Sequence, residues 1–336
     1  MNSGSSIELD FSAFSQIGYG GTGIVFKGTL DDKVYLVKVL TTNHDIDVIF
    51  RRVKNIRESF SGRTIPSSFN KRTLPIGQGI IHSRDLGKSF DDLSRSYPFL
   101  VFNYIDGIDL EQYLKDEEPC SIKRCRILDK VLSLLKALEI SGVVHYDLYP
   151  DNFLVDSRGT VFLIDVESAG FVRDGKWQWE PLVEGKTGIF CIPPDATNGT
   201  THGLYFDRWN AMYLVFFILF KKHPFEFLNR CDVEALKELI SNALPASTWP
   251  PSLKNDNSFN KYLKEPGAIQ AMKEELVGFI GSDLTLLATL LHECFIKGYL
   301  KPESRPDIMK IRKAMELITA NIISKRKGAS KTKKKA

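Results

Sequence analysis

The sequence lacks the features that mark disulfide-stabilised, secreted and membrane-spanning proteins. No two of its five cysteines form a CxxC pair, which argues against a disulfide framework and against a cysteine-rich zinc site. The longest apolar run, residues 211–220, is about half of the ~20 residues that a membrane-spanning helix needs. The N-terminal residues show neither the basic nor the apolar region of a signal peptide. We therefore expect a cytoplasmic protein, because cysteines stay reduced in the cytosol.

Length and charge predict two lobes and a basic tail. The 336 residues exceed the ~250–300 residues at which a single core stops growing. Seven of the 45 basic residues lie in residues 325–336, and without them 41 acidic residues outnumber the remaining 38 basic ones. Such a charge run is usually a solvated, disordered tail. The functional alternative is an electrostatic contact with nucleic acid or an anionic membrane surface, or a nuclear address in a eukaryotic cell.

Hydrophobic periodicity divides the chain into a small strand-rich part and a larger helical part. β-Branched and aromatic residues predict strands within residues 11–40, 78–84 and 98–104, and a hairpin at 153–164. Apolar residues at three- and four-residue steps predict helices at 45–60, 121–140, 206–221, 232–243, 283–295 and 306–320. The change of pattern at Asp106-Gly107 indicates a hinge between the two parts.

Residues 18–23 (GYGGTG) form a glycine-rich turn between two predicted strands. They satisfy the pattern GxGxxG, but a dinucleotide-binding site requires a helix after it, and here a strand follows. Strand, glycine-rich turn and strand is the arrangement that covers ATP phosphates in protein kinases. Glycines allow this because backbone N–H groups without neighbouring Cβ atoms can reach phosphate oxygens. The alternative is a hairpin turn with no ligand.

Two further features indicate phosphate chemistry. Lys38 lies in an apolar strand, where a buried ammonium needs an anion, unless its stem carries the charge out to water. Asp147 and Asn152 lie in one loop, and Asp165 follows a short strand. These three residues provide one carboxylate to orient a hydroxyl nucleophile, and an amide and a second carboxylate to hold Mg²⁺ through oxygen. The alternative for the loop residues is that they cap turns.

In order and spacing these motifs resemble a divergent eukaryotic-type Ser/Thr protein kinase domain, over about residues 11–320. HYDLYPDNFLVD (145–156) is similar to the family's catalytic loop, HRDLKPxNxLxD, and LIDVE (163–167) stands where the family has its DFG segment. Other similar segments are FLVFNYIDG (99–107), CIPPD (191–195), DRWN (207–210), HPF (223–225) and Arg305-Pro306.

The resemblance implies an α+β, two-lobed fold. A small antiparallel β N-lobe with one helix is expected at residues 11–105, and a larger, mainly α-helical C-lobe at 106–322. Residues 1–10 and the basic tail at 323–336 are expected to be disordered. The implied activity is transfer of the γ-phosphoryl of Mg·ATP to Ser or Thr hydroxyls of a protein substrate.

The resemblance also implies roles for individual residues. Asp147 orients the hydroxyl, Lys38 holds the α- and β-phosphates, and Asn152 and Asp165 ligate Mg²⁺. The remaining ATP-binding residues are the phosphate-covering Gly18, Tyr19, Gly20, Gly21, Thr22 and Gly23, the adenine-packing Val25 and Leu154, the gatekeeper Phe102, the adenine-bonding Asn103 and Ile105, and Asp109 near the ribose. Asp195 and Arg305 are expected to form a structural ion pair.

The departures from the family pattern bear on activity and regulation. Tyr146 replaces the arginine that usually receives an activation-loop phosphate, so we expect constitutive activity. Tyr149 replaces the lysine that neutralises the γ-phosphate, and Glu167 replaces the glycine of DFG and adds a carboxylate near the metal. A helix carboxylate should pair with Lys38, and the sequence leaves two candidates, Glu58 and Asp47; the alternative is that the carboxylate on this helix is only solvated.

Two other functions fit these departures. A pseudokinase that binds ATP or a partner as a scaffold is favoured by Tyr146, Tyr149 and Glu167. A small-molecule kinase of related fold is favoured by Asp165-Val166-Glu167, because an acidic residue after the metal-binding aspartate occurs in aminoglycoside and choline kinase relatives. The segment 191–195, Asp207 and Arg305 oppose it, because they resemble parts of the protein kinase C-lobe.

Overall fold

The computed structural model describes most of the chain in segments: residues 9–20, 23–41, 46–63, 66, 74–82, 86, 96–117, 120–181, 203–221, 224, 285–298 and 301–333. The chain divides into two compact units. The first comprises residues 1–108 and 153–168, and the second comprises 109–152 and 169–336. The division falls close to the expected hinge, but the hairpin at residues 153–163 groups with the first unit. Within the described ranges, no helix is both long and apolar enough to cross a membrane.

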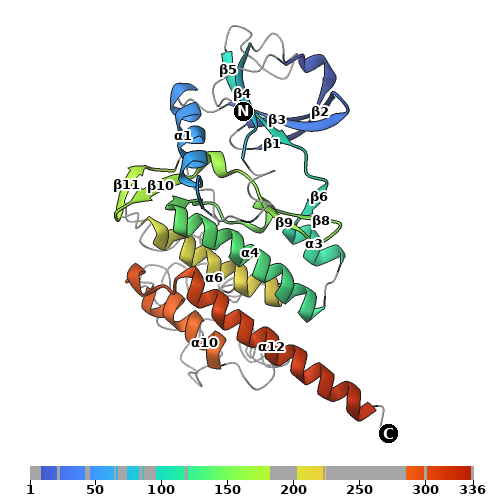
Figure 1. Cartoon of the computed structure of the whole chain (residues 1–336), viewed down its shortest axis with the longest axis vertical. Coiled ribbons are helices and arrows are strands. Elements are labelled where there is room, and N and C mark those ends of the chain that lie inside the picture. The colour runs from blue at the N-terminus through green and yellow to red at the C-terminus, as the bar shows by residue number, and fades with distance from the viewer. Residues whose placement is uncertain are drawn as a thin grey trace, which may run out of the picture. The chain divides into compact units, whose positions relative to one another are not determined.

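The first unit is built on a five-stranded antiparallel sheet of order β1-β2-β3-β5-β4 (Figure 1). Its strands are β1 (Phe14–Gly20), β2 (Gly23–Leu30), β3 (Lys33–Leu40), β4 (Gly77–His82) and β5 (Ser96–Asn103). A smaller sheet of order β6-β8-β9 contains β6 (Gly107–Asp109), β8 (Phe153–Asp156) and β9 (Val161–Leu163). Helix α1 (Ile46–Ser59) and the single turn η4 (Val166–Ser168) contact each other, and a further turn, η1 (Phe11–Ala13), precedes β1. The predicted strands and the 45–60 helix are therefore confirmed.

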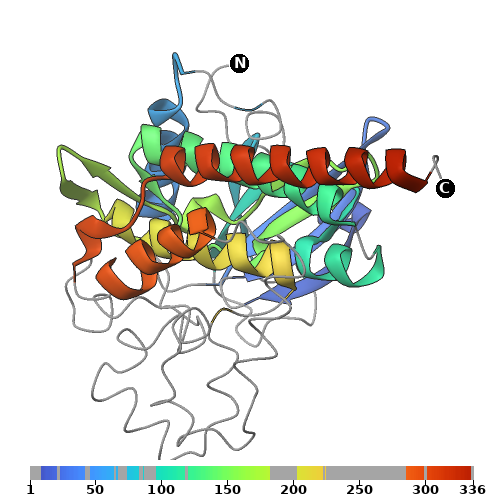
Figure 2. The ribbon, with the colours of Figure 1, turned by 90° about the horizontal axis from the view of Figure 1, so that it is seen from below.

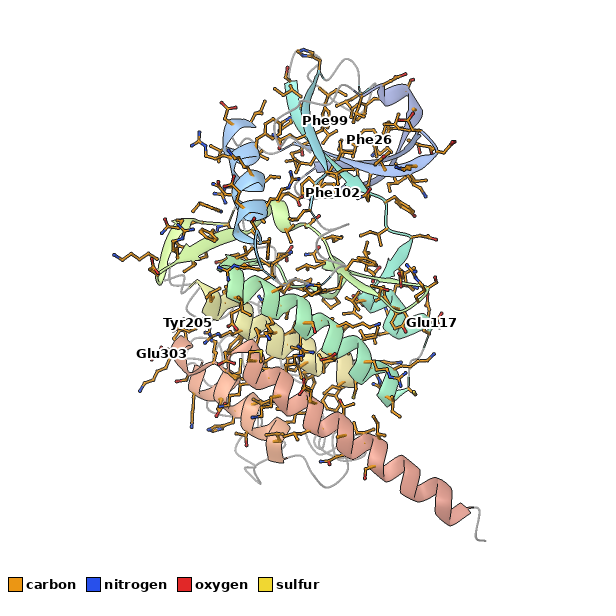
Figure 3. The ribbon with its side chains drawn as sticks, viewed as in Figure 1. Phe26, Phe99, Phe102, Glu117, Tyr205 and Glu303 are labelled. Atoms are coloured by element: carbon orange, nitrogen blue, oxygen red, sulfur yellow. The ribbon has the colours of Figure 1, made fainter. Side chains whose placement is uncertain are left out.

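The two faces of the large sheet differ in what they bury. Alternate residues of a strand point to opposite faces. One face carries the aromatic core, in which the ring of Phe11 meets those of Phe26 and Phe99 at 5.6 and 5.7 Å between centroids. Figure 3 labels Phe26, Phe99 and Phe102 in this sheet. Lys38 is one position out of phase with the core residues Val37 and Val39, so it lies on the opposite face.

The second unit is mainly helical, and its helices α4, α6 and α12 lie side by side (Figure 1). Seen from below, α12 runs along α4 (Figure 2). Its helices are α3 (Leu110–Asp116), α4 (Ser121–Ser141), α6 (Leu204–Phe220), α10 (Thr285–His292) and α12 (Ile308–Lys333), with shorter turns η3 (Pro150–Asn152), η7 (Glu293–Lys297) and η8 (Pro302–Ser304). A small sheet is formed by β7 (Val143–Val144), β10 (Gly170–Arg173) and β11 (Lys176–Trp179).

Helix ends in this unit follow from local sequence. Helix α4 stops at Gly142, which has φ 72° and donates its N–H to the carbonyls of Leu138 and Glu139. Glycine adopts this left-handed conformation without a steric penalty. Helix α12 is longer than the expected helix at 306–320, and it continues through most of the basic segment to Lys333. Ala, Lys and Arg are good helix formers once a packed helix precedes them, so the expectation of a disordered tail from residue 323 is wrong as far as Lys333.

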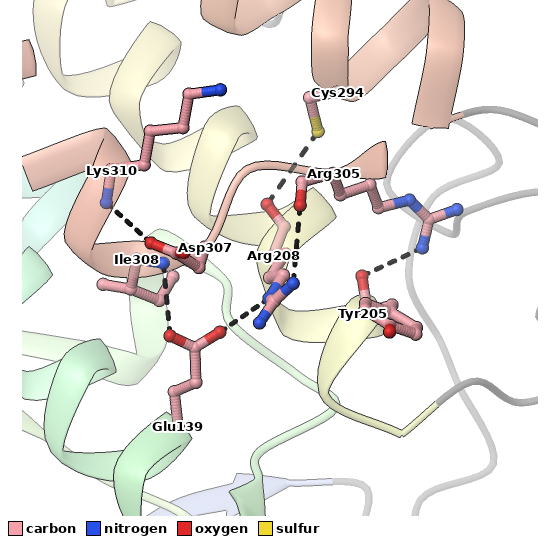
Figure 4. Close-up of polar contacts among 8 residues, drawn as sticks. All are labelled: Glu139, Tyr205, Arg208, Cys294, Arg305, Asp307, Ile308 and Lys310. Carbon is pink, nitrogen blue, oxygen red and sulfur yellow. Dashed lines mark hydrogen bonds and ion pairs between the residues drawn. The ribbon is translucent and has the colours of Figure 1, made fainter. Parts of the chain in front are cut away.

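Glu139 joins three helices of the second unit (Figure 4). Its Oε1 accepts a hydrogen bond from Nε of Arg208 on α6 at 2.6 Å, and its Oε2 accepts one from the backbone N–H of Ile308 on α12 at 3.2 Å. The carboxylate is only 15% exposed, so it is screened less than a surface ion pair. Glu139 therefore fixes α4 against both neighbouring helices.

Replacing Glu139 tests this role. We expect Glu139→Gln to lower the free energy of unfolding by about 1–3 kcal/mol, because one buried acceptor becomes a donor that faces another donor. Urea denaturation measures the change. The matched control is Glu111→Gln on α3, whose pair with Lys115 is exposed and should contribute less than about 0.5 kcal/mol. Equal effects of the two substitutions would contradict the account.

Candidate functional site

In the first unit, the site face of the sheet is defined by one row of paired residues. Gly18 pairs with Val25, Val25 with Lys38, and Lys38 with Leu100 across strands β1, β2, β3 and β5. Residues paired across a sheet point to the same face. The register thus brings the glycine-rich strand end, the expected adenine-packing valine and the strand lysine onto one surface.

Lys38 is buried and bonded to two carboxylates. Its Nζ lies 2.7 Å from Oε1 of Glu167 and 3.0 Å from Oδ1 of Asp165. The lysine side chain is 7% exposed, Glu167 is 5% exposed, and Asp165 is 40% exposed. Burial lowers the pKa of Lys38, but the charges and hydrogen bonds of Glu167 and Asp165 outweigh it, so the pKa is raised above its ordinary value. The ammonium therefore stays protonated at neutral pH.

The partner of Lys38 is not the helix carboxylate that the sequence predicted. Glu58 lies on the exposed surface of α1, with its side chain 63% exposed and 3.9 Å from Nζ of Lys54. Asp47, also on an exposed position, does not bond to Lys38 either. Both candidates are therefore wrong, because the inner face of α1 is apolar and buries Ile49, Val53 and Ile56. Glu167 occupies the position beside Lys38 instead.

The glycine-rich segment spans the end of β1 and the start of β2. Gly18, Tyr19 and Gly20 end β1, Gly23 begins β2, and Gly20 pairs with Gly23. Tyr19 is 75% exposed. Gly21 and Thr22 lie outside the described residues. Gly23 is closely packed, because a Cβ atom there would overlap the carbonyl oxygen of Val39. The hairpin geometry expected from the sequence is present on both sides of the turn.

Gly23 offers a test of this packing. We expect Gly23→Ala to lower the free energy of unfolding by about 1–3 kcal/mol, because the added methyl group overpacks against the β3 backbone. Gly18→Ala is the matched control, since its Cβ would meet its nearest neighbour, Cβ of Val25, at an ordinary 3.9 Å. Thermal unfolding of both variants measures the difference. A Gly18 variant that is destabilised as much as the Gly23 variant would disprove the packing argument.

The residues expected around the adenine lie at the end of β5 and nearby. Phe102 pairs with Leu36, and both are on the Lys38 face by register. Asn103 ends β5 opposite Tyr35, Ile105 follows with a buried side chain, and Leu154 is half-buried in β8. Asp109 was expected near the ribose. In the structure its Oδ1 accepts the backbone N–H of Gln112 at 2.7 Å and caps α3.

In the second unit, Asn152 holds Asp147. Nδ2 of Asn152 donates to the backbone carbonyl of Asp147 at 2.7 Å and to its Oδ2 at 2.9 Å. Both acceptors are oxygens, so the nitrogen of the amide must face Asp147. The amide oxygen of Asn152 is thereby turned away from Asp147. The turn η3, which contains Asn152, fixes this geometry over five residues of chain.

The backbone ahead of Asp147 is fixed by a buried carboxylate. Asp207 on α6 accepts the backbone N–H of His145 at 2.7 Å and that of Tyr146 at 3.0 Å. Tyr146 has φ 68°, an unfavourable conformation for a non-glycine residue. Its ring stacks on Phe206 at 3.8 Å between centroids. Burial raises the pKa of Asp207 to about 6, although His145 and the two backbone donors lower it. Asp207 lies in the segment 207–210 that resembles the family, but nothing in the sequence indicates its contact with His145 and Tyr146.

The structure also describes two further residues of the second unit that the sequence singled out, Tyr149 and Arg305. Tyr149 lies near Tyr213, with ring centroids 6.1 Å apart. Arg305 is 1% exposed and donates to the carbonyls of Gly298 and Tyr205, each at 2.9 Å. Its expected partner Asp195 lies outside the described residues, as do the 191–195 segment and the predicted 232–243 helix.

Comparison with known proteins identifies the family. The sequence model of the protein kinase domain matches residues 11–280, which is most of the chain, and the chain belongs to this family. Similar proteins include a probable serine/threonine-protein kinase PknB of Lactococcus lactis, 24% identical over 221 residues that cover 64% of this chain and 32% of that protein. A RAC family serine/threonine-protein kinase homolog of Dictyostelium discoideum is 25% identical over 224 residues, 64% of this chain and 45% of that protein.

A third relative is the serine/threonine-protein kinase PrkC of Bacillus subtilis, 23% identical over 254 residues that cover 74% of this chain and 36% of that protein. The matched part of this chain thus spans less than half the length of each of these relatives. The expected α+β, two-lobed protein kinase fold is confirmed by the family match together with the antiparallel sheet and the helical second unit.

Proposed function

We propose that this chain is an ATP-dependent protein kinase that transfers the γ-phosphoryl group of Mg·ATP to Ser or Thr hydroxyls of protein substrates. The observation that carries the proposal is the Asp147–Asn152 pair, in a loop whose backbone Asp207 holds. Asp147 accepts and orients the substrate hydroxyl. Family membership and the names of the relatives support Ser/Thr specificity, which is proposed here for this chain.

ATP and Mg²⁺ fit the chemistry of the residues present. Asn152 and Asp165 would hold Mg²⁺, a cation that prefers carboxylate and amide oxygens. The amide nitrogen of Asn152 is already used by Asp147, so its oxygen is available for a cation, and the carboxylate of Asp165 is 40% exposed. Bound Mg²⁺ supplies neutralisation of phosphate charge. Lys38, which stays protonated, provides the second cation for the phosphates.

The protein residues act chiefly by positioning. In the proposed nucleotide site, Gly18, Gly20 and Gly23 cover the phosphates with backbone N–H groups. The residues proposed around the nucleotide base are Val25, Phe102, Asn103, Ile105 and Leu154. Phosphoryl transfer needs little covalent chemistry from the protein, so alignment and charge account for most of the rate. We also propose a cytoplasmic location, in keeping with the reduced cysteines expected from the sequence.

Phosphate transfer from γ-labelled ATP tests the proposal. The full chain is incubated with Mg²⁺ and generic protein substrates, and phosphoamino acids are identified after hydrolysis. Label on Ser or Thr in the wild type, absent from Asp165→Asn, supports a Ser/Thr protein kinase. ATP binding without transfer would favour the pseudokinase alternative. Consumption of ATP that depends on aminoglycoside or choline, with no label on protein, would favour a small-molecule kinase.

A further inference from the structure

Both partners of Lys38 come from one short segment of the chain. Asp165 and Glu167 are two residues apart, immediately after strand β9 and at the turn η4. Each carboxylate lies within 3.0 Å of the lysine Nζ. The lysine itself lies on β3, 129 positions from Glu167. All three residues belong to the first unit, so this arrangement does not depend on how the two units are placed.

The two carboxylates differ sharply in exposure. Glu167 is 5% exposed and Asp165 is 40% exposed. A buried charge needs a permanent partner, because removing it from water is costly. Asp165 has water available to it and can bond to another cation when one is bound. Glu167 keeps one partner, Lys38, on Oε1, and its Oε2 is buried without a hydrogen bond in the part of the chain that the structure describes.

Helix α1 supplies no carboxylate at this point. It contacts η4, but its buried residues are all aliphatic. Its acidic residues lie at exposed positions, and Glu58 lies 3.9 Å from the ammonium of Lys54 on the same helix. The charge that compensates Lys38 therefore comes from Asp165 and from Glu167 in η4, and α1 contacts η4 without adding a carboxylate.

We infer that Glu167 is the positioning residue of Lys38, and that it takes over the orienting task for which a helix α1 carboxylate was expected. This inference rests on the proposed nucleotide-binding function. Glu167 holds the lysine ammonium toward the phosphates while Asp165 is engaged with the metal. Because the lysine and the metal-binding aspartate are anchored to one segment, moving α1 neither forms nor breaks the ion pair. Among the residues that the structure describes, α1 therefore supplies no carboxylate whose movement could make or break an ion pair with Lys38.

A double-mutant cycle on the full chain tests the inference. The variants are Lys38→Ala, Glu167→Gln and the double variant, with Glu58→Gln as the matched control on α1. The readout is the affinity for a fluorescent ATP analogue, measured once with Mg²⁺ and once with EDTA. We expect Glu167→Gln to weaken the binding of the analogue by at least about tenfold, both with Mg²⁺ and with EDTA. A loss of this size corresponds to one lost charge-assisted hydrogen bond.

The cycle separates positioning from other roles. A residue that acts only through Lys38 has no further effect once the lysine is gone, so the double variant should bind no more weakly than Lys38→Ala. Glu58→Gln should bind like the wild type. Glu167→Asp keeps the charge on a shorter stem, so its affinity should lie between those of the wild type and Glu167→Gln. Circular dichroism and thermal unfolding check that each variant folds, and Glu167→Asp serves as the test if Glu167→Gln does not.

Several results would overturn the inference. A loss in Glu167→Gln that appears only with Mg²⁺ would make Glu167 a metal ligand. If the loss of binding free energy in the double variant equals the sum of the losses in the two single variants, Glu167 acts independently of Lys38. If Glu58→Gln loses as much affinity for the analogue as Glu167→Gln does, α1 contributes to positioning Lys38 and the inference is wrong. Failure of the proposed function gives a different result. If the variants show the expected binding cycle but the wild type transfers no phosphate, the inference stands and the proposed kinase activity is wrong. A wild type that binds no ATP analogue overturns both.

Discussion

Asp147→Asn is expected to lower the rate of phosphoryl transfer by about 10²–10⁴-fold, which corresponds to about 3–5 kcal/mol of activation free energy. The carboxylate that accepts from the substrate hydroxyl becomes a neutral amide and loses its basicity. The fold should survive, because the amide oxygen at position 147 can still accept from Nδ2 of Asn152, as Oδ2 does now. Nucleotide affinity should therefore stay within about twofold of the wild type.

Single-turnover phosphate transfer and nucleotide binding, measured on the same preparations, check this prediction. The matched control is Asp174→Asn, at an exposed turn between β10 and β11 where φ is 52°. Asparagine tolerates that conformation as well as aspartate does, so the control should transfer phosphate at the wild-type rate. Equal rates in the wild type and Asp147→Asn would refute the assigned role of Asp147.

Asp207→Asn is expected to cause the largest loss of stability, about 3 kcal/mol in the free energy of unfolding. The carboxylate of Asp207 accepts two backbone N–H groups, from His145 and Tyr146. An asparagine has one acceptor oxygen, so its NH₂ group would face one of these donors in a buried site. The backbone at Tyr146, which has an unfavourable φ, would then be held by one hydrogen bond from position 207 in place of two. Loss of catalytic rate should accompany the loss of stability.

Denaturant unfolding of Asp207→Asn measures this loss against Asp129→Asn. Asp129 accepts from Arg312 at 2.9 Å, but its side chain is 49% exposed, so its replacement should cost less than about 1 kcal/mol. A control variant as unstable as Asp207→Asn would show that burial of the acceptor is not the cause.

The pH dependence of stability, compared between the wild type and Asp207→Asn, gives a second test of the role of Asp207. Burial raises its pKa in the folded protein to about 6, from an ordinary value of 3.8. Between these values the folded state binds more protons at this site than the unfolded state does, so raising the pH favours unfolding. The stability advantage of the wild type over Asp207→Asn should therefore decrease as the pH rises from about 4 to about 6, and remain constant above that range. An advantage that grows over this interval would contradict the pKa shift.

Local sequence patterns predicted the elements well, because their causes are local. The strands of the first sheet follow from β-branched and aromatic residues, and α4 ends at Gly142 because that glycine can adopt positive φ. The hairpin of β8 and β9 was predicted from the turn at Asp156, whose Oδ1 accepts from Thr160 at 2.7 Å. The sequence predicted that the last helix ends at residue 320, whereas α12 continues to Lys333. A run of charged residues predicts disorder unless the packed helix before it is known.

The sequence singled out candidate site residues that are close together in the chain, but it could not identify contacts that tertiary structure selects. Asp147 and Asn152 are five residues apart, and their pairing follows from one turn. The partner of Lys38 depends on which of several carboxylates the fold brings to β3, and sequence spacing pointed to α1. The spacing of Ile49, Val53 and Ile56 was the signal that could have excluded Glu58, because Glu58 does not lie three or four residues from any of them and so falls off the buried face. Glu139 carried no comparable sequence signal.

The measurement that tests the central claim most directly is the stoichiometry of ADP formed to phosphate bound to protein, determined for the wild type and Asp147→Asn with Mg·ATP and a protein substrate. The account predicts one protein-bound phosphoserine or phosphothreonine for each ADP in the wild type, and almost none in the variant. ADP without protein-bound phosphate, or equal phosphate in both proteins, would contradict the claim that this chain is a protein kinase that uses Asp147.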